Sequence, residues 1–322
     1  MPRIRAGVVG LGVMGKHHFR VLHEDENFDL VGIFDPGFSQ SNHRGVRNFA
    51  NLDLLLELEL DYCVISVPTI YHSNIFDEVS KLCRCILVEK PIASNSDEAQ
   101  RMIELSLTRG ILAAVGHVER FNPAIQLMRQ LVQENHVGEV IQITTRRQGP
   151  FPQRIQDVGV IKDLATHDID ITQWVTNSKY SEIAAYSKKM PGSFHEDLLS
   201  ASGILKSGAL FNHVVNWRYP LKERVVSVLG TKGALVADLL TSDLTYFENG
   251  LEPTSWGQMS LLRGNSEGSS TKFAVNKIEP LQSEHNAMRS ALLSGKSQDI
   301  VTLEQGFENI KVAERMISSI TK

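Results

Sequence analysis

Gly10-Leu11-Gly12-Val13-Met14-Gly15 is the stretch that decides the fold of the first part of this chain. It directly follows an apolar run at residues 5–9 and opens a segment with helical spacing. In a strand–turn–helix of this kind, the first glycine permits the tight turn and the second lets a pyrophosphate approach the backbone. The third glycine allows close packing of the helix on the strand, and the helix N-terminus adds unpaired N–H groups. The stretch therefore predicts a dinucleotide-binding turn, against the alternative of a turn with coincidental glycines.

Asp35 follows the second apolar run and lies twenty residues after Gly15. A carboxylate at this point can accept hydrogen bonds from both hydroxyls of an adenosine ribose. It would also repel a 2′-phosphate, because both groups are negatively charged. The expected cofactor is therefore NAD rather than NADP.

Short apolar runs alternate with segments of helical spacing through residues 1–118. This alternation is typical of a parallel sheet with helices on both faces, which predicts an α/β amino-terminal Rossmann domain over residues 1–118. The expected strands lie at residues 5–9, 30–34, 62–67, 85–88 and 111–115, and the expected helices at residues 14–23, 75–82 and 97–107.

The pattern changes after Gly116, where long strand candidates joined by glycine-containing turns replace the strand–helix alternation. We expect an α+β domain with an open, mainly antiparallel sheet over residues 119–322. Helices are expected near residues 124–132 and 164–175, strands at 140–145, 183–188, 198–205, 209–217 and 225–229, and a surface loop at 249–271. Two helices close the chain, and the apolar face of the last one indicates that it docks back toward the first domain.

Composition narrows the class of protein. The 322 residues are 42% hydrophobic and 22% charged, with a net charge of −4, which suits two globular domains. A slightly acidic chain lacks the excess of Lys and Arg that binding to a phosphate backbone needs, so no nucleic-acid partner is expected. The first residues lack the apolar core of a signal peptide, and no apolar run has the length of a membrane span. We expect a cytoplasmic protein with no membrane partner.

The cysteines Cys63, Cys83 and Cys85 are odd in number and lack zinc-like spacing, which predicts reduced thiols. Cys83 and Cys85 could form a redox pair, but both border an apolar run, which favours packing in the core or at a strand edge. His17 and His18 could be imagined as metal ligands. Adjacent helical positions point in different directions, so we expect one histidine to pack and the other to be solvated, and no metal.

Two further segments indicate an enzyme. Glu89-Lys90-Pro91 stands at the carboxyl end of the fourth expected strand, where ligands of open α/β sheets bind, so Lys90 is expected in the cofactor cleft. A surface lysine at a strand exit is the alternative, and position alone does not decide between them. On the following domain, Asp163 and His167 are four residues apart in a helical segment and should share a face.

A histidine is suited to take a hydroxyl proton near neutral pH, and a neighbouring carboxylate can orient it. Asp170, three residues beyond His167, lies on the same side. Zinc binding is a rival interpretation of this spacing, but it would need more Cys or His ligands than the chain offers. Capping of the helix by Asp163 is a second structural alternative.

These motifs together resemble the Gfo/Idh/MocA family of sugar oxidoreductases over essentially the full chain. The matching elements are Gly10–Gly15, Glu89-Lys90-Pro91, Gly116-His117-Val118-Glu119-Arg120-Phe121-Asn122-Pro123, Asp163 with His167-Asp168, and Val228-Leu229-Gly230-Thr231-Lys232-Gly233. The resemblance implies a catalytic set of Lys90, Asp163 and His167. His167 would act as general base, Lys90 would polarise the reacting oxygen, Asp163 would tune the site, and hydride would pass from an alcohol carbon to nicotinamide. The expected cofactor contacts are Gly10, Gly12, Val13, Met14, Gly15, Asp35, Ser66, Pro68, Thr69, His72, Glu89 and Lys90.

Three arginines, Arg146, Arg147 and Arg154, precede the second motif. Guanidinium groups suit bidentate recognition of phosphates, although a solvated loop with structural Arg–Asp pairs is an equal alternative. The whole pattern is similar to the nucleotide-sugar branch of the family, the UDP-N-acetylglucosamine 3-dehydrogenases. This resemblance implies oxidation of the C3 hydroxyl of a UDP-sugar, with substrate contacts from Lys90, Arg146, Arg154, Asp163 and His167.

Alternative functions on the same fold are an inositol or aldose dehydrogenase, an NAD-dependent glycosidase, and a non-catalytic NAD and sugar sensor. The partner expected in each case is a small sugar or nucleotide sugar. The family's sheet also commonly forms oligomers. Around Trp217 neither face of the expected strand is wholly polar, so a homodimer or homotetramer is expected.

Overall fold

The computed structural model describes residues 3–151, 158–250, 267–296 and 300–320. The chain forms two compact units. The first comprises Met1–Phe121 and Glu279–Glu314, and the second comprises Asn122–Ile278 and Arg315–Lys322. The division thus falls after Phe121, where the sequence suggested 118, and a segment near the carboxyl end belongs with the first unit.

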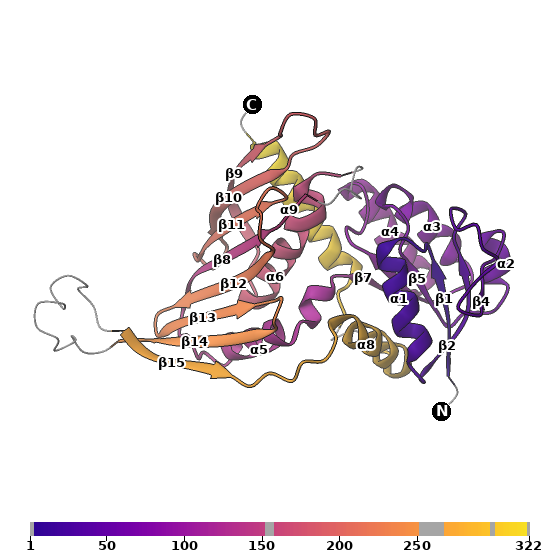
Figure 1. Cartoon of the computed structure of the whole chain (residues 1–322), viewed down its shortest axis with the longest axis horizontal. Helices are drawn as coiled ribbons and strands as arrows, with labels where there is room; N and C mark the ends of the chain where they lie inside the picture. Colours follow the sequence, from indigo (N-terminus) through magenta and orange to yellow (C-terminus); the bar gives the residue numbers. More distant parts are fainter. Residues whose placement is uncertain (1–2, 152–157, 251–266, 297–299, 321–322) are drawn as a thin grey trace, which may run out of the picture. The chain divides into compact units, whose positions relative to one another are not determined.

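The first unit is built on a five-stranded sheet in the order β2-β1-β5-β6-β7 (Figure 1). All four strand pairings are parallel, as the alternating sequence pattern predicted. Its elements are β1 Ile4–Val9, α1 Val13–Glu24, β2 Phe28–Phe34, β3 Asn42–His43, β4 Val46–Arg47, α2 Leu52–Leu56, β5 Tyr62–Ile65, η1 Thr69–Tyr71, α3 His72–Val79, β6 Cys85–Glu89, α4 Ser96–Arg109, β7 Leu112–Gly116, η2 Val118–Phe121, α8 Pro280–Ser294 and α9 Leu303–Ser319, which ends in the second unit.

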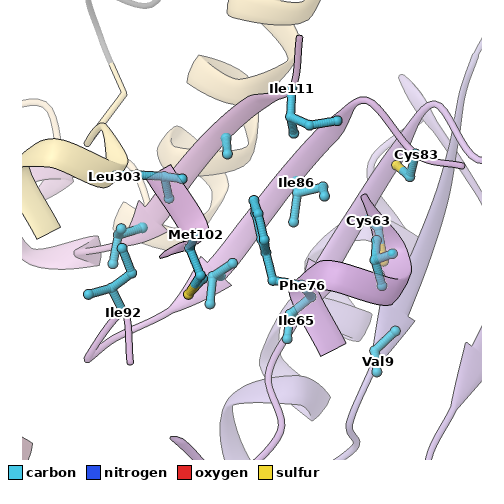
Figure 2. Close-up of a cluster of buried hydrophobic side chains, with 14 of the residues drawn as sticks. Val9, Cys63, Ile65, Phe76, Cys83, Ile86, Ile92, Met102, Ile111 and Leu303 are labelled. Carbon is cyan, nitrogen blue, oxygen red and sulfur yellow. The ribbon is translucent and has the colours of Figure 1, made fainter. Parts of the chain in front are cut away.

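Each face of this sheet has its own apolar core. On one face, Phe19 of α1 and Met288 of α8 pack against buried strand residues such as Val8. On the other, Phe76 of α3 and Met102 of α4 pack with residues of β5 and β6, and Leu303 of α9 joins the same cluster (Figure 2). Helices cover both faces, which confirms the predicted Rossmann arrangement and leaves the carboxyl ends of the strands to carry a ligand.

The second unit is an eight-stranded sheet in the order β15-β14-β13-β12-β8-β11-β10-β9 (Figure 1). Only the β8–β11 pairing among these is parallel, so the prediction of an open, mainly antiparallel sheet is confirmed. Its elements are α5 Pro123–Gln133, β8 Val140–Gln148, η3 Ile161–Ala165, α6 Thr166–Thr176, β9 Tyr180–Lys188, β10 Leu198–Leu205, β11 Leu210–Asn216, β12 Glu223–Gly230, β13 Gly233–Asp238, β14 Asp243–Asn249 and β15 Glu267–Phe273.

Helices α5 and α6 lie on one face of this sheet, against β13, β14 and β8. Phe211, His213 and Val215 point to that face and are fully buried. The residues between them point the other way, and Leu210 and Val214 are 47% and 37% exposed. The alternation expected for this strand is therefore present. The opposite face, on which the described residues place no helix, carries exposed apolar side chains.

Two sequence-based boundaries are wrong in the second unit. The expected surface loop at residues 249–271 overlaps β14, which ends at Asn249, and β15, which begins at Glu267. The β8 strand, expected to end at 145, continues to Gln148 and so includes Arg146 and Arg147. Cross-strand pairing with β11 and β12 holds this polar end of β8 in the sheet, although its composition resembles that of a loop. No helix within the described ranges is long and apolar enough to span a membrane.

Candidate functional site

The glycine turn has the geometry that its sequence predicts. Gly10 has a φ of +93°, and a Cβ there would lie 2.7 Å from the Ser66 carbonyl oxygen. A Cβ on Gly15 would lie 2.0 Å from the Gly10 carbonyl oxygen, so only glycine allows α1 to start this close to β1. A Cβ on Gly12 would meet nothing within 4 Å. The open space is therefore at the glycine where a pyrophosphate would approach the backbone, and the turn fits a dinucleotide.

Two polar residues fix this turn to its neighbours. The Ser66 hydroxyl donates to the Gly10 carbonyl at 2.9 Å. The Asp35 carboxylate accepts the Leu11 N–H at 2.5 Å and the Gly37 N–H at 2.7 Å. Asp35 remains partly exposed, and each carboxylate oxygen retains a lone pair for a ribose hydroxyl. The structure thus brings Asp35 and the glycine turn together at the carboxyl ends of β1 and β2.

Glu89 and Lys90 close the carboxyl end of β6. The Lys90 N–H donates to Glu89 Oε2 at 3.0 Å, and His18 Nε2 lies 2.8 Å from Glu89 Oε1. Burial raises the pKa of the Glu89 carboxyl, but the hydrogen bond and charge of His18 outweigh it and hold this pKa below its ordinary value. Glu89 is thus a buried carboxylate that anchors Lys90, whose side chain is partly exposed.

His72 is 1% exposed, and its two ring nitrogens lie 3.0 Å from the Pro91 carbonyl and 2.9 Å from the Val67 carbonyl. Burial lowers the pKa of His72, and the hydrogen bonds to these carbonyls partly oppose the effect. His72 therefore ties the loop after β5 to the loop after β6. Pro68 in the first of these loops is exposed, whereas Thr69 is buried.

Asp163 and His167 lie at the start of the second unit's helix α6, in a region with unusual backbone geometry. Ile161–Ala165 is a π-helical turn, and α6 begins at Thr166. Because a π turn bonds each N–H five residues back, the α-helical rule that places residues four apart on one face does not carry over unchanged. The N-cap positions of the π turn and of α6 are Val160 and Ala165, so Asp163 stands at the N-cap of neither.

Glu196 holds the entrance to the π turn. Its carboxylate accepts the Ile161 N–H at 3.1 Å, and its carbonyl accepts the Val160 N–H at 3.0 Å. A Cβ on Gly159 would lie 2.0 Å from Glu196 Oε1, so a larger residue there would displace the Glu196 carboxylate. His167, at 9% exposed, follows on the first turn of α6, while Asp163 is partly exposed. Sequence reasoning missed Glu196, because its partner lies 35 residues away.

Under α6, buried polar side chains attach the helix to the sheet. Arg147 Nε lies 3.1 Å from both carboxylate oxygens of Asp168, with both side chains 2% exposed. Alongside, His213 joins Thr145 at 2.8 Å and Tyr180 at 2.7 Å. Burial lowers the pKa of His213 to about 3 and raises the pKa of Tyr180 well above its ordinary value. The Arg147–Asp168 pair thus fixes the residue that follows His167.

The arginine cluster is divided by the structure. Arg147 is taken up by Asp168, and Arg146 is 49% exposed but pairs with Glu223 at 2.9 Å. Arg154 lies outside the described residues. For Arg147, the alternative of a structural pair with an Asp is therefore correct. Arg146 could bind a phosphate only if its guanidinium left Glu223 or bound both groups at once.

The remaining sequence expectations concern thiols and histidines. All three cysteines are free and buried, which confirms that they pack in the core, and burial raises the pKa of the Cys83 thiol to about 12. His18 is fully buried and His17 is exposed, as expected for adjacent helical positions. Among the residues that the structure describes, no three His, Cys, Asp or Glu side chains gather as metal ligands would.

The fold and the glycine turn together define an NAD-binding oxidoreductase. Residues 4–117 match the family model described as "Oxidoreductase family, NAD-binding Rossmann fold", and residues 125–236 match the "GFO/IDH/MocA C-terminal domain". The chain belongs to the Gfo/Idh/MocA oxidoreductase family.

Relatives within the family have different substrates. A stretch of 189 residues is 30% identical to UDP-N-acetylglucosamine 3-dehydrogenase of Acidithiobacillus ferrooxidans, and it covers 58% of each chain. Inositol 2-dehydrogenase 2 of Paenarthrobacter aurescens is 25% identical over 99% of this chain and 96% of its own length. A solved structure of the Acidithiobacillus ferrooxidans enzyme has a TM-score of 0.85 at 22% identity, with 99% of this chain and 98% of that chain covered. The last comparison supports the fold alone.

Proposed function

We propose that this protein is a sugar dehydrogenase that oxidises a secondary hydroxyl to a ketone, with the C3 hydroxyl of UDP-N-acetylglucosamine or a related UDP-sugar as substrate. The observation that carries the oxidoreductase part is the turn at Gly10–Gly15 with Asp35 beside it. Its open position at Gly12 fits a pyrophosphate, and its carboxylate fits the ribose of NAD. NAD, when bound, accepts a hydride from the alcohol carbon.

The chain's own residues supply acid–base chemistry and orientation. His167, at the start of α6, takes the hydroxyl proton as general base, and Asp163 tunes it. Lys90, fixed through its backbone N–H to Glu89, polarises the reacting oxygen. Pro68 and Thr69, in the loop that His72 ties to Pro91, contact the nicotinamide side of the cofactor. Val13 and Met14 complete the cofactor contacts at the first turn of α1.

The UDP-sugar assignment rests on likeness to UDP-N-acetylglucosamine 3-dehydrogenase and on Arg146 and Arg154 as phosphate ligands. One observation favours a second candidate, an inositol or aldose dehydrogenase. The match to inositol 2-dehydrogenase 2 extends over 99% of the chain, and Arg146 and Arg147 already have acidic partners. A neutral polyol carries no phosphate, so its binding would need neither Arg146 nor Arg147.

A substrate panel separates the two candidates. Purified protein is mixed with NAD and, in separate reactions, UDP-N-acetylglucosamine, other UDP-sugars, free hexoses and inositols, and reduced nicotinamide is followed by absorbance. We expect the signal with UDP-sugars. A signal with inositols or hexoses and none with UDP-sugars would replace the UDP-sugar assignment by the polyol one. Hydrolysis of the sugar without net reduction of NAD would indicate a glycosidase. Binding of NAD without turnover of any sugar would indicate a sensor.

Two variants test the assigned chemistry. His167→Ala and Lys90→Ala should each lower kcat by about 10²- to 10⁴-fold, the usual contribution of a positioned acid–base group, and His167→Ala should leave the Kd for NADH unchanged. The exposed His136→Ala and Lys81→Ala variants are the matched controls. Turnover of His167→Ala at the rate of His136→Ala would refute the role of His167 as base.

A third part of the proposal concerns assembly and location. We propose a cytoplasmic homodimer or homotetramer that associates through the face of the eight-stranded sheet without helices. Exposed apolar side chains on β11, β12 and β14 support this surface, and three free buried thiols suit a reducing compartment.

A further inference from the structure

A line of four buried side chains runs behind the Glu89-Lys90-Pro91 turn. Glu89 Oε1 lies 2.8 Å from His18 Nε2, and His18 Nδ1 lies 3.0 Å from His285 Nε2. His285 Nδ1 lies in turn 3.0 Å from the Tyr62 hydroxyl. His18 and His285 are fully buried, and Tyr62 and Glu89 are 1% and 5% exposed. The line joins α1, α8, β5 and β6 within one compact unit.

The hydrogen bonds in this line are compatible with one another. A carboxylate only accepts, so His18 must carry a proton on Nε2. Burial, together with the charge of His18, lowers the pKa of His285 well below its ordinary value, so His285 is uncharged. An uncharged His285 has a single ring N–H: when it is on Nε2 it donates to His18 Nδ1, and His285 Nδ1 accepts the Tyr62 O–H. Every donor then points toward Glu89, and each nitrogen in the line is satisfied.

The other oxygen of Glu89 connects this line to the proposed chemistry. Glu89 Oε2 accepts the Lys90 backbone N–H at 3.0 Å. The carboxyl group is also closely packed, since a Cβ on Gly116 of β7 would lie 3.1 Å from Glu89 Cδ. A carboxylate held at one oxygen by His18 and enclosed by β7 has little freedom to rotate, so its second oxygen presents a fixed acceptor to Lys90.

We propose that His18, His285 and Tyr62 are positioning residues: they orient Glu89 so that it fixes the backbone of Lys90 where the side chain leaves the sheet. The role rests on the proposed function of Lys90 as the group that polarises the reacting oxygen. The three residues act through Glu89, so their loss should affect the rate of turnover more than the binding of cofactor or substrate.

Two substitutions of His285 separate hydrogen bonding from packing. His285→Phe keeps a ring of similar size but removes both polar atoms, whereas His285→Gln can donate to His18 and accept from Tyr62. His23→Phe is the matched control, because His23 is an exposed histidine that stacks on Phe19 at the far end of α1. This control makes the same His→Phe change at a residue that does not belong to the buried line.

The first readout is hydrogen exchange of the Lys90 amide, measured by NMR, which does not depend on activity. We expect protection to fall about 10-fold or more in His285→Phe, because the acceptor is released, and to remain near the wild-type value in His285→Gln and His23→Phe. Equal protection of Lys90 in all four proteins would overturn the proposal, whatever the substrate proves to be.

The second readout is kinetic. His285→Phe should lower kcat about 10- to 100-fold, as misplacement of a reacting group does, with the KM for NAD changed less than about 2-fold. His285→Gln should recover most of the loss. Equal losses in the Phe and Gln variants would show that the line serves packing only. If the wild-type protein turns over no sugar, the proposed function fails, while the exchange experiment still decides the positioning role.

Discussion

The Asp35 carboxylate is held by two backbone N–H groups, from Leu11 in the glycine turn and Gly37 in the loop beyond β2. Asn48 adds a third constraint, because its side-chain oxygen accepts the Asp35 N–H at 3.1 Å. These contacts orient both carboxylate oxygens before a ribose binds. Preorganisation of this kind lowers the entropy that cofactor binding must overcome.

We predict that Asp35→Ser weakens NADH binding and admits NADPH. The variant loses the acceptors for two ribose hydroxyls, and one hydrogen bond to a charged group contributes about 1.5–3 kcal/mol, so the Kd for NADH should rise about 10- to 100-fold. Asp35→Asn keeps the shape and one acceptor oxygen but removes the negative charge and replaces the other oxygen with an NH2 donor, so it should relieve the repulsion of the 2′-phosphate with a smaller loss of acceptors than Asp35→Ser. Fluorescence titrations with both cofactors measure the effect. An unchanged Kd for NADH in Asp35→Ser would contradict the assignment of Asp35.

Sequence reasoning worked at single residues where the requirement is local. The positions of Gly10, Gly12 and Gly15 follow from the tight turn, and the structure shows the space and the close approaches that they predict. The partner of His18 could not be predicted, because Glu89 lies 71 residues away and only the packing of α1 on the sheet brings it near. The sequence indicated only that one of the two adjacent histidines would pack and the other be solvated.

Helix α6 is attached to its sheet by charge as well as by apolar contact. Both side chains of the Arg147–Asp168 pair are buried, and Arg147 lies near the carboxyl end of β8. A buried pair of this kind is costly to break, because the remaining partner is left as an uncompensated charge.

Arg147→Met should therefore lower the free energy of unfolding by about 3–5 kcal/mol, whereas Arg146→Met, at the exposed pair with Glu223, should change it by less than about 1 kcal/mol. The double variant Arg147→Met with Asp168→Leu should recover much of the loss. Urea unfolding measures all three. Equal effects of the two single arginine variants would show that the Arg147–Asp168 pair does not hold α6.

Buried histidines predict acid sensitivity of the fold. The folded-state pKa of His213 is lowered to about 3, so between the unfolded value of about 6.5 and pH 3 the unfolded chain binds one more proton at this site. Stability should be fully present above about pH 6.5 and should fall as the pH decreases, by up to about 1.4 kcal/mol per pH unit from His213.

His72 and His285, whose pKa values burial also lowers, add to the same slope. His213→Gln removes one titrating group and should flatten the dependence. Urea unfolding at several pH values measures the slope, and a wild-type stability that is constant between pH 7 and pH 4 would contradict the burial of uncharged histidines.

At the level of elements, periodicity predicted the parallel sheet and most helices, because each strand is buried on both faces and reads as a continuous apolar run. It failed for the polar end of β8 and for β15, where pairing with neighbouring strands rather than apolar composition determines the structure. It also did not find the π turn at Ile161–Ala165, since a one-residue change in helical bonding leaves no periodic signature.

The face of the eight-stranded sheet without helices is the main unassigned surface of the second unit. Leu210 and Val214 on β11 are 47% and 37% exposed, and Leu229 on β12, across the intervening strand β8, is 39% exposed. Tyr186 and Phe247 add aromatic area farther out. Exposed apolar area on this face supports the proposed association with a second copy through the same face.

Leu210→Glu combined with Val214→Glu should therefore lower the mass measured by light scattering to that of a smaller species, because charges would be buried against an apolar partner. Leu107→Glu, at a 73% exposed position on α4 of the first unit, is the control and should leave the mass unchanged. A wild-type protein that is already a monomer, or a double variant of unchanged mass, would contradict this interface.

For the whole molecule, the sequence predicted the family and the cofactor because separate motifs agree over most of the chain, and the matches to residues 4–117 and 125–236 confirm both. It could not determine the substrate. Arg147 was available as a phosphate ligand in the sequence, but in the fold it is paired with Asp168. The choice among sugars thus depends on side-chain partners that only the tertiary structure creates.

The most direct test of the central claim follows one atom. The protein is incubated with NAD and UDP-N-acetylglucosamine that carries deuterium at C3, and the reduced cofactor is examined by mass spectrometry. We predict that the nicotinamide gains one deuterium and that the sugar becomes a 3-ketone. Deuterium retained on the sugar, or lost to water without appearing in the cofactor, would contradict hydride transfer from this carbon.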